Sequence, residues 1–480
     1  MRFPNAKSVR ETKILLMIKL KQLGKNVEEI RPFIERYGGI FNDLTIATRF
    51  LWAKEFPVEY AVINDTLIMR ENNGETSYFY YPLGKDEKTA FVEIEEYAAE
   101  NDGGTLRFGN LDRTQATALS ERYDVFEIHS FREWSDYIYP VEQFRTYTGK
   151  KLSGQRNHVN KFKKTYPDYR VGVIEKKDIP ALKEFLKEYE KENEFSGWAA
   201  AEQPKVYELL DNMERLGQFG VYLSVNGKIA SFSVGERVGD TLFSHVEKGL
   251  KEYEGVYPVT AQEFVKAFAK DGVQFVNREE DCGDTGLRTS KMQYHPSEIK
   301  EKYHVSVRSS FFKIKPPVMI ATERLLITDI YQKDKDDYAK LYTDDTVNAF
   351  YGYDYRQDLN GNTADGDYFL GFFQGLKDKK EEYSLAVRLD GKMIGEIVFY
   401  GFGFHDQAEI GFRFFTEYQR KGYGYESVSA AMEYAFNAGF RRITCRHFTA
   451  NVASERLIAK LGFSFVRETK THKFYRKDNG

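Results

Sequence analysis

Short runs of apolar residues recur along the chain in pairs, and a two-residue turn separates the members of each pair. The turns are Asn64-Asp65, Asn226-Gly227 and Asp390-Gly391. Such residues tolerate the positive φ angles of tight hairpin turns, so the flanking runs predict antiparallel hairpins. The expected strand pairs are Tyr60–Ile63 with Thr66–Met69, Gly220–Val225 with Lys228–Val234, and Tyr383–Leu389 with Lys392–Tyr400.

A second pattern follows each hairpin at the same period. It consists of a strand, a segment with helical periodicity, a glycine that ends the helix, and another strand. The expected helices are Thr89–Asn101, Val259–Lys270 and Glu426–Ala438. Two landmarks with one period favour three diverged copies of a mixed α/β module, because chance rarely repeats both. The alternative is that any α/β chain shows units of hairpin, helix and strand.

Composition agrees with a chain of this kind. At about 150 residues per domain, 480 residues predict about three domains, and 41% hydrophobic with 30% charged residues is typical of soluble globular proteins. The net charge of −3 creates no global field for nucleic acid or acidic membranes. The apolar run Ile14–Ile18 is too short for a signal peptide or a membrane span.

Cys282 and Cys445 lie far apart in the sequence and form no CxxC pair. A disulfide framework and a cysteine-based zinc site are therefore not expected. We expect a reduced, cytoplasmic protein without membrane insertion and without a metal.

The clearest chemistry lies in the third copy, between the strand that ends near Phe415 and the helix that begins near Glu426. There, Gln419 begins a Gln-x-x-Gly-x-Gly loop that contains Gly422 and Gly424. Glycines let the backbone turn tightly and approach a ligand closely. Free N–H groups at the start of a helix then point at an anion. With Arg420 and Lys421 beside them, these residues predict a pyrophosphate site.

This loop resembles the acetyl-CoA pyrophosphate motif of the GNAT acetyltransferases. Asn451–Phe463 is similar to a later motif of that superfamily, and Thr322–Leu325 is similar to the first strand of its ribosomal-protein N-terminal acetyltransferase branch. The resemblance covers about 320–477 and implies transfer of acetyl from acetyl-CoA to an amine, either a small molecule or a peptide N-terminus. The implied cofactor-binding residues are Phe414, Phe415, Gln419, Arg420, Lys421, Gly422, Tyr423, Gly424, Tyr425 and Asn451.

The family mechanism, direct attack of an amine on the thioester, assigns roles to three positions. Glu409 is expected as the base, with a solvated strand carboxylate as the alternative. Backbone N–H near Phe415 is expected to polarise the carbonyl. Ser454 is expected as the acid for the thiol, with helix capping as the alternative. Asn451 is expected either to bind the pantetheine arm or to be a turn residue.

The corresponding loops of the other copies are Tyr253–Pro258 and Tyr81–Lys85, and neither can present the same row of amides. Only the third copy is expected to bind coenzyme A. Residues 40–307 instead resemble the C-terminal domain of phosphatidylglycerol lysyltransferases, a tandem of two GNAT-like halves that takes an aminoacyl group from charged tRNA. The matching stretches are Gly149–Lys164, Tyr253–Pro258 and Asn277–Pro296. The family's transmembrane region is absent from this sequence.

Basic residues in these stretches are second-site candidates. Arg156 and His158 lie in a cluster that suits phosphates, including a tRNA backbone, or forms a solvated helix start. Arg278, Arg288 and Lys291 are expected either to grip a tRNA 3′ end or an acidic acceptor, or to pair with the acidic residues nearby.

The architecture is therefore expected to be mixed α/β, with three GNAT-like modules. The limits are 1–145 and 146–310 for the two halves of a tandem, 311–318 for a linker marked by Pro316-Pro317, and 319–480 for the acetyltransferase domain. Three functions stay open: an N-acetyltransferase acting through the last module, an aminoacyl-tRNA-dependent transferase for a soluble acceptor, and an N-terminal module that only binds substrate.

Overall fold

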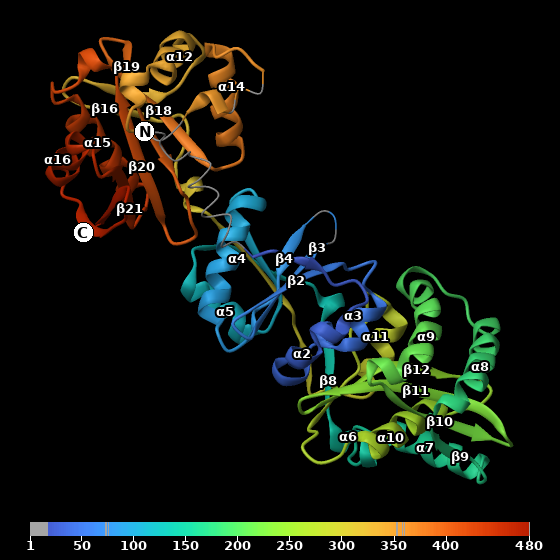
Figure 1. Ribbon diagram of the computed structural model, residues 1–480. Helices are drawn as coiled ribbons and strands as arrows, with labels where there is room; N and C mark the ends of the chain where they lie inside the picture. Colours follow the sequence, from blue (N-terminus) through green and yellow to red (C-terminus); the bar gives the residue numbers. More distant parts are fainter. Residues whose placement is uncertain are drawn as a thin grey trace.

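The computed structural model describes residues 18–72, 74, 76–351, 354–357, 359 and 361–479. These residues form three mixed sheets, which we call the first, second and third units together with the helices that pack on them. In Figure 1 the third unit, drawn in orange and red, lies at one end, the first unit in the middle and the second at the other end.

The first unit has the strand order β1-β2-β3-β4-β6-β15-β7, with β5 paired to β3. Its strands are β1 (Lys21–Gln22), β2 (Val58–Ile63), β3 (Thr66–Asn72), β4 (Ser77–Phe79), β5 (Leu83–Gly84), β6 (Thr105–Leu111), β7 (Val125–Ser130) and β15 (Tyr303–Arg308). Its helices are α2 (Arg31–Tyr37), α3 (Ile46–Leu51), α4 (Glu87–Asn101) and α5 (Arg113–Arg122).

The second unit has the order β14-β8-β13-β12-β11-β10-β9. Its strands are β8 (Asp136–Pro140), β9 (Arg170–Val173), β10 (Phe219–Val225), β11 (Lys228–Val238), β12 (Thr241–Gly249), β13 (Phe275–Asn277) and β14 (Glu298–Lys300). Its helices are α6 (Val141–Thr146), α7 (Ser153–Thr165), α8 (Ile179–Lys191), α9 (Gly197–Leu216), α10 (Val256–Phe268) and α11 (Thr285–Met292).

The third unit has the order β16-β17-β18-β19-β20-β21-β23-β22. Its strands are β16 (Met319–Ala321), β17 (Leu326–Asp329), β18 (Glu382–Leu389), β19 (Lys392–Tyr400), β20 (Gln407–Phe414), β21 (Arg442–Phe448), β22 (Ser464–Glu468) and β23 (His472–Asp478). Its helices are α12 (Lys335–Thr343), α13 (Asp345–Asn348), α14 (Gly366–Asp378), α15 (Tyr423–Asn437) and α16 (Val452–Lys460).

The threefold repeat is confirmed at the level of strand pairing. In each unit a hairpin is followed by an antiparallel strand, a helix and a strand parallel to the one before the helix; the parallel pairs are β4 with β6, β12 with β13, and β20 with β21. Both residues of each predicted turn have positive φ, as at Asn64 (47°) and Asp65 (58°). The hydrophobic pattern and turn chemistry therefore identified the module correctly.

The first two units exchange strands, which the sequence analysis did not anticipate. β8 precedes the expected limit at 145 yet pairs with β13 and β14 of the second unit. β15 belongs to the second half in sequence yet pairs with β6 and β7 of the first unit. The two halves are thus tied by their backbones, and the domain limits remain a proposal about sequence only.

The segment 311–318, expected as a linker, packs against the third unit. Phe311, Ile314 and Val318 are buried in the core of the third unit. Lys313 forms ion pairs with Asp124 of the first unit and Asp406 of the third. The Pro316-Pro317 bond, which is cis, ends regular structure here without creating a flexible spacer.

Candidate functional site

The central strands of the third unit separate where a ligand would enter. β20 and β21 pair over Gln407–Glu409 and Arg442–Thr444 only, although both strands continue beyond these residues. Past Glu409 the two backbones therefore diverge. The loop between β20 and α15 lies at the open end of this gap and contains the Gln-x-x-Gly-x-Gly sequence.

The helix that follows this gap begins with open amide groups. Gly422 is the N-cap of α15 with φ of 86°, and no side chain caps the helix. Among the described residues, no acceptor binds the N–H groups of Tyr423, Gly424 and Tyr425. A helix start with free N–H groups attracts phosphate oxygens, so the local geometry fits a pyrophosphate.

Arg324 supports this loop, and the sequence analysis did not identify it. Its Nη1 donates to the carbonyl of Lys421 at 3.2 Å, and its guanidinium pairs with Glu426 at 2.6 Å and lies over the ring of Tyr423. It also lies 3.1 Å from the place where a side chain at Gly422 would begin. The resemblance of Thr322–Leu325 to a first strand gives no sign of these contacts, and the structure places this stretch between β16 and β17.

The equivalent helices of the other two units have different surroundings, although α10, like α15, has an N-cap glycine with positive φ and no capping side chain. Asp86 caps α4 by accepting from Thr89 N at 3.1 Å, so a carboxylate already occupies the position of an anion. Gly255 begins α10, but a Cβ there would approach the carbonyl oxygen of His158 within 2.6 Å, which shows how closely α7 covers the loop. These contacts support the expectation that only the third unit binds coenzyme A.

The amides near Phe415, one of which is expected to polarise the thioester, are not equally available. The N–H of Phe415 itself donates to the carbonyl of Ile394 at 3.1 Å and is therefore occupied. Because antiparallel strands alternate, the N–H groups of Phe412 and Phe414 point away from β19 and toward the gap beside β21. Phe414 is therefore the better placed of the two phenylalanines named from the sequence.

Glu409 is held at the base of the gap by two neighbours. Its Oε1 accepts from the hydroxyl of Tyr400 at 2.7 Å and lies 3.1 Å from Nε of Arg446. No hydrogen bond from the described residues reaches its Oε2. Burial, reinforced by Glu409, raises the pKa of Tyr400 well above its usual range, which keeps the phenol protonated as a donor.

Asn451 and Ser454 share the start of α16. Asn451 is the N-cap and its Oδ1 accepts from the N–H of Ser454 at 3.1 Å. The capping role considered for Ser454 therefore belongs to Asn451. This bond uses the backbone N–H of Ser454 and not its hydroxyl, and the expected role of that hydroxyl as an acid stays a prediction.

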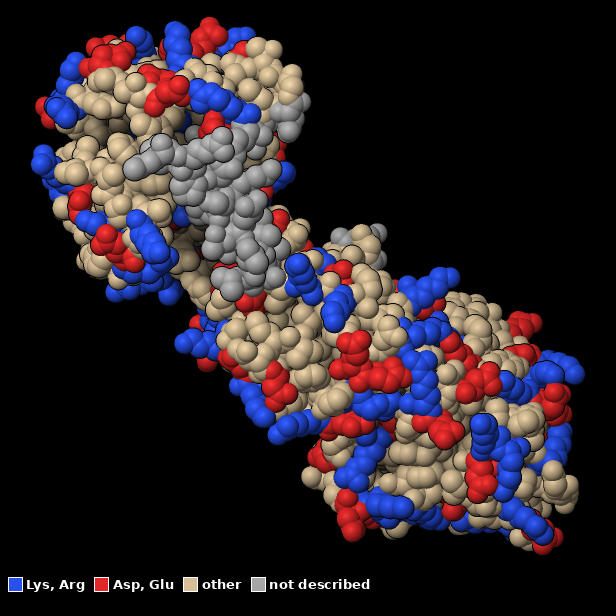
Figure 2. Space-filling view, viewed as in Figure 1, with Lys and Arg blue, Asp and Glu red and all other residues tan. Residues whose placement is uncertain are grey.

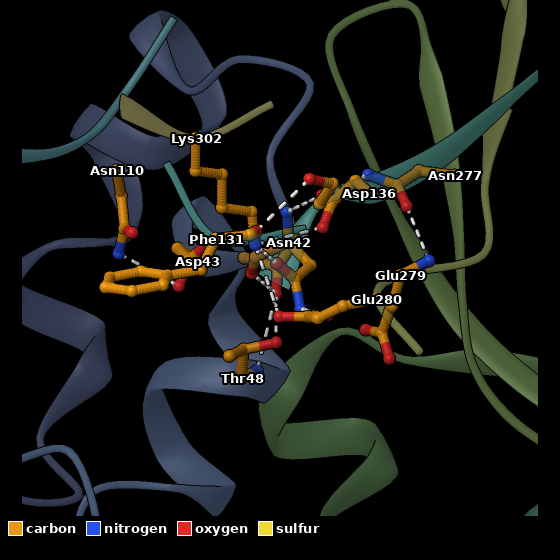
Figure 3. Close-up of polar contacts among 12 residues, drawn as sticks. Asn42, Asp43, Thr48, Asn110, Phe131, Asp136, Asn277, Glu279, Glu280 and Lys302 are labelled. Carbon is orange, nitrogen blue, oxygen red and sulfur yellow. Dashed lines mark hydrogen bonds and ion pairs between the residues drawn. The ribbon is translucent and has the colours of Figure 1, made fainter. Parts of the chain in front are cut away.

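A second cluster lies where the first and second units meet (Figure 3). Nζ of Lys302 lies 2.5 Å from Asp43, 2.9 Å from Asp136 and 3.2 Å from Glu280. It also donates to Oδ1 of Asn42 at 2.7 Å. Three carboxylates from three separate segments thus surround one buried ammonium, and sequence spacing gives no sign of this.

The carboxylates of this cluster titrate differently. Burial raises the pKa of Glu280 to about 7, with Lys302 opposing the rise and Asp136 and Asp43 adding to it. Burial also raises the pKa of Asp136. Burial would lower the pKa of Lys302, but the surrounding carboxylates raise it well above its usual range. The cluster therefore keeps its cation and holds a carboxyl that changes charge near neutral pH.

His245 connects the same region to the first unit. Its ring nitrogens lie 2.9 Å from Glu236 and 2.6 Å from Glu279, and Glu236 in turn accepts from the N–H groups of Ile46 and Ala47 at the start of α3. Burial would lower the pKa of His245, but the two carboxylates raise it to about 10. A charged imidazolium thus joins the two units.

Three of the second-site candidates are engaged by the protein itself. Arg288 forms two 2.8 Å bonds to Asp281, and Arg278 pairs with Glu247 at 3.1 Å. Lys291 is buried and donates to the carbonyls of Glu279 and Glu280. These contacts favour the structural alternative, in which the residues brace the loop 277–284.

Some members of the basic cluster on α7 bind groups of the protein, and others are exposed. Arg156 donates to the carbonyls of Tyr147 and Gly149, and Lys161 pairs with Glu254. His158 is exposed on the same helix. Across the visible face of the molecule, Lys and Arg are interspersed with Asp and Glu (Figure 2), so a phosphate role for this cluster stays a prediction.

In the described part of the chain, no group of three or more His, Cys, Asp or Glu side chains is arranged to hold a metal ion. No helix found there has the length and apolar character needed to cross a bilayer. The expectations of no metal and of a cytoplasmic location stay predictions.

Comparisons with known proteins divide the chain in the same way. Residues 38–306 match the family described as phosphatidylglycerol lysyltransferase, C-terminal, and residues 324–464 match the acetyltransferase (GNAT) domain. The uncharacterized N-acetyltransferases YoaA and YnaD of Bacillus subtilis are 29% and 31% identical over 147 and 144 residues, which are 30% of this chain and 82% and 81% of theirs.

One solved structure resembles a larger part of the chain. It is a conserved protein of unknown function from Bacteroides thetaiotaomicron, with 30% identity and a TM-score of 0.56. The match covers 60% of this chain and 99% of that one.

Proposed function

The chain belongs to the family of the phosphatidylglycerol lysyltransferase C-terminal domain and carries a GNAT acyltransferase domain after it, and on this basis we propose that the third unit transfers acetyl from acetyl-CoA to an amine. The observation that carries the proposal is the uncapped start of α15 beside the gap between β20 and β21. Free amides there suit a pyrophosphate, and the gap suits an extended thioester arm.

Bound acetyl-CoA supplies a thioester carbonyl as the electrophile. Glu409 takes a proton from the acceptor amine, directly or through water, through the oxygen that its neighbours leave open. The N–H of Phe414 or Phe412 donates to the carbonyl oxygen as negative charge develops on it. Ser454 gives a proton to the departing sulfur while the new C–N bond replaces the C–S bond.

Titration calorimetry of the full chain with acetyl-CoA tests this proposal. Gly422→Val places a β-branched residue at a φ of 86° and fills the space beside Arg324, so we expect binding to be lost. Gly439→Ala is the matched control because Gly439 also has positive φ, at the other end of α15. Equal binding by both variants and the wild type would remove the proposal.

We propose aminoacyl transfer by the first two units as a second candidate function. The specific observation is the buried cluster at the junction of the two units, where Lys302 lies within 3.2 Å of Glu280 and contacts Asp136 and Asp43. Burial raises the pKa of Glu280 to about 7, which suits a group that takes up a proton from an amine at neutral pH. The test is retention of charged tRNA by the full chain at increasing salt. Retention that does not depend on salt, or no transfer to any soluble acceptor, favours a module that only binds substrate.

A further inference from the structure

We propose that the acceptor is a peptide whose amino terminus is followed by acidic residues, and that an arginine-bearing face of the third sheet binds them. This inference rests on the proposed acetyl transfer and names its substrate class. The face, which we call the acceptor face, is the side of β20–β23 that carries Glu409, Thr444, Arg446, Arg467, His472, Phe474 and Arg476. Its occupant follows from the order of charges across it.

Strand alternation defines this side of the sheet. Ile443 and Cys445 of β21 are buried with the core residues of α15 and α16. Side chains alternate along a strand, so Thr444 and Arg446 point to the opposite side, together with Glu409. Lys473 confirms the assignment for β23, because it pairs with Glu455 of α16 and leaves Phe474 on the acceptor face.

One row of paired residues crosses the sheet from β18 to β22 on this side. The register places Glu382 beside Tyr400, Tyr400 beside Glu409, Glu409 beside Thr444, Thr444 beside Arg476 and Arg476 beside Ser464. Carboxylates therefore stand at one end of the row and a guanidinium toward the other. The carboxylate end coincides with the site where the amine must lie.

A parallel row repeats the positive end. Arg446, Phe474 and Arg467 are adjacent across β21, β23 and β22. The guanidinium of Arg467 lies 3.8 Å from the ring centre of Phe474, and it contacts no carboxylate of the described residues. Stacking on an aromatic ring holds a guanidinium in place while its N–H groups stay available to a ligand.

The other three arginines of this face, Arg442, Arg446 and Arg476, share two carboxylate partners. Arg442 and Arg476 share Asp478, at 2.6 and 3.5 Å, and Arg446 pairs with Glu409. The side chain of Arg476 is 50% exposed. Among the ion pairs of the described part of this face, the guanidinium groups of Arg442, Arg446, Arg467 and Arg476 thus meet two carboxylates, one of which is Glu409 at the expected place of the amine, and the excess positive charge favours an anionic partner.

The spacing fits a polypeptide better than a small amine. Adjacent strands lie about 4.8 Å apart, so Arg476 lies about 10 Å from Glu409 across β21, and Arg467 lies further. An extended chain covers about 3.3 Å per residue. A peptide whose ammonium lies at Glu409 therefore brings its third and fourth side chains to the arginines, where carboxylates form charge-assisted hydrogen bonds.

The test compares two peptides as acceptors for the full chain. One has an amino-terminal serine followed by glutamates, and the other has glutamines in their place. We expect a kcat/KM at least tenfold higher for the acidic peptide, with the difference shrinking as salt increases. Arg467→Gln and Arg476→Gln are expected to raise KM for the acidic peptide about tenfold each while kcat stays near the wild-type value.

Arg467→Glu sharpens the test, because it should reverse the preference toward a peptide with lysines. Arg441→Gln is the matched control, since Arg441 precedes β21 and its side chain is 84% exposed near Asp406. Equal kcat/KM for the acidic and neutral peptides, or a preference for a polyamine over both, overturns the inference. If acetyl-CoA does not bind at all, the proposed function fails instead, and calorimetry distinguishes this result.

Discussion

The hydroxyl of Tyr400 donates to Oε1 of Glu409 at 2.7 Å, and the two residues face one another across β19 and β20. This bond holds one oxygen of the carboxylate, and no hydrogen bond from the described residues reaches the other. We expect Glu409→Gln to lower kcat about 10²- to 10⁴-fold with little change in acetyl-CoA binding, because general bases contribute rate in this range.

Tyr400→Phe separates positioning from proton transfer. It removes the hydrogen bond while Glu409 keeps Arg446, so we expect a smaller loss of kcat, about tenfold, and a pH–rate profile with a displaced acidic limb. Stopped assays of free thiol release across pH measure both variants. An unchanged kcat for Glu409→Gln leaves Glu409 as a solvated strand carboxylate.

Mutation of Asn451 should lower stability, whereas mutation of Ser454 should lower kcat. Asn451→Ala removes the N-cap of α16, and we expect about 0.5–2 kcal/mol lower stability, measured by urea unfolding. Ser454→Ala keeps the capping bond because only its backbone N–H is used, so stability should hold while kcat falls. The assignment is wrong if Ser454→Ala unfolds more easily and retains full kcat.

The repeat and the anion loop were predictable because both depend on short segments. Asn64-Asp65 adopts the positive φ angles that its chemistry favours, and Gly422 begins a helix as the motif requires. Local backbone preferences act over a few residues, so they can be read in order along the chain. The three units and their parallel strand pairs followed from these signals.

The sites that depend on distant contacts were not predictable. Lys302 contacts Asp43, 259 positions earlier, because β15 pairs with strands of the first unit. The hydrophobic pattern along the chain gives no sign of which strands pair in this way. The amide that polarises the thioester could be named only as one near Phe415, because the partner strand determines which amides of β20 are already bonded. For Arg288 and Lys291 the sequence left two kinds of partner open, a bound ligand or nearby groups of the protein, and the structure shows that they bind groups of the protein.

The contact between the first and third units, made by Phe404 and His405, should couple the unfolding of the two units. Phe404, between β19 and β20, packs into the core of the first unit, and His405 stacks on Tyr123 and bonds to Glu95 at 3.0 Å. We expect Phe404→Ala to remove about 3–5 kcal/mol of coupling and to split one denaturant transition into two. His405→Ala, at the exposed side of the contact, should have a smaller effect; a single unchanged transition for Phe404→Ala argues against coupling through this contact.

Glu280 should make the junction of the first two units sensitive to pH. Its pKa is about 7 in the folded chain and near 4.3 in an unfolded one, so the folded state binds more protons between these values. The stability from protonated Glu280 is complete below about pH 4.3 and is lost as pH rises through 7. Relative to Glu280→Gln, the wild type should lose up to about 1.4 kcal/mol per pH unit across this window.

Lys302→Met tests the cation of the same cluster. It leaves Asp43, Asp136 and Glu280 buried together without their shared ammonium, so we expect a loss of about 3–5 kcal/mol at pH 8. The loss should shrink at pH 5, where the carboxyls with raised pKa are protonated. Lys300→Met is the matched control, because among the described residues Lys300 pairs with Glu298 alone, and its removal should cost less than about 1 kcal/mol. A loss for Lys302→Met that stays constant between pH 5 and 8 would show that proton uptake by these carboxyls does not compensate for the missing charge.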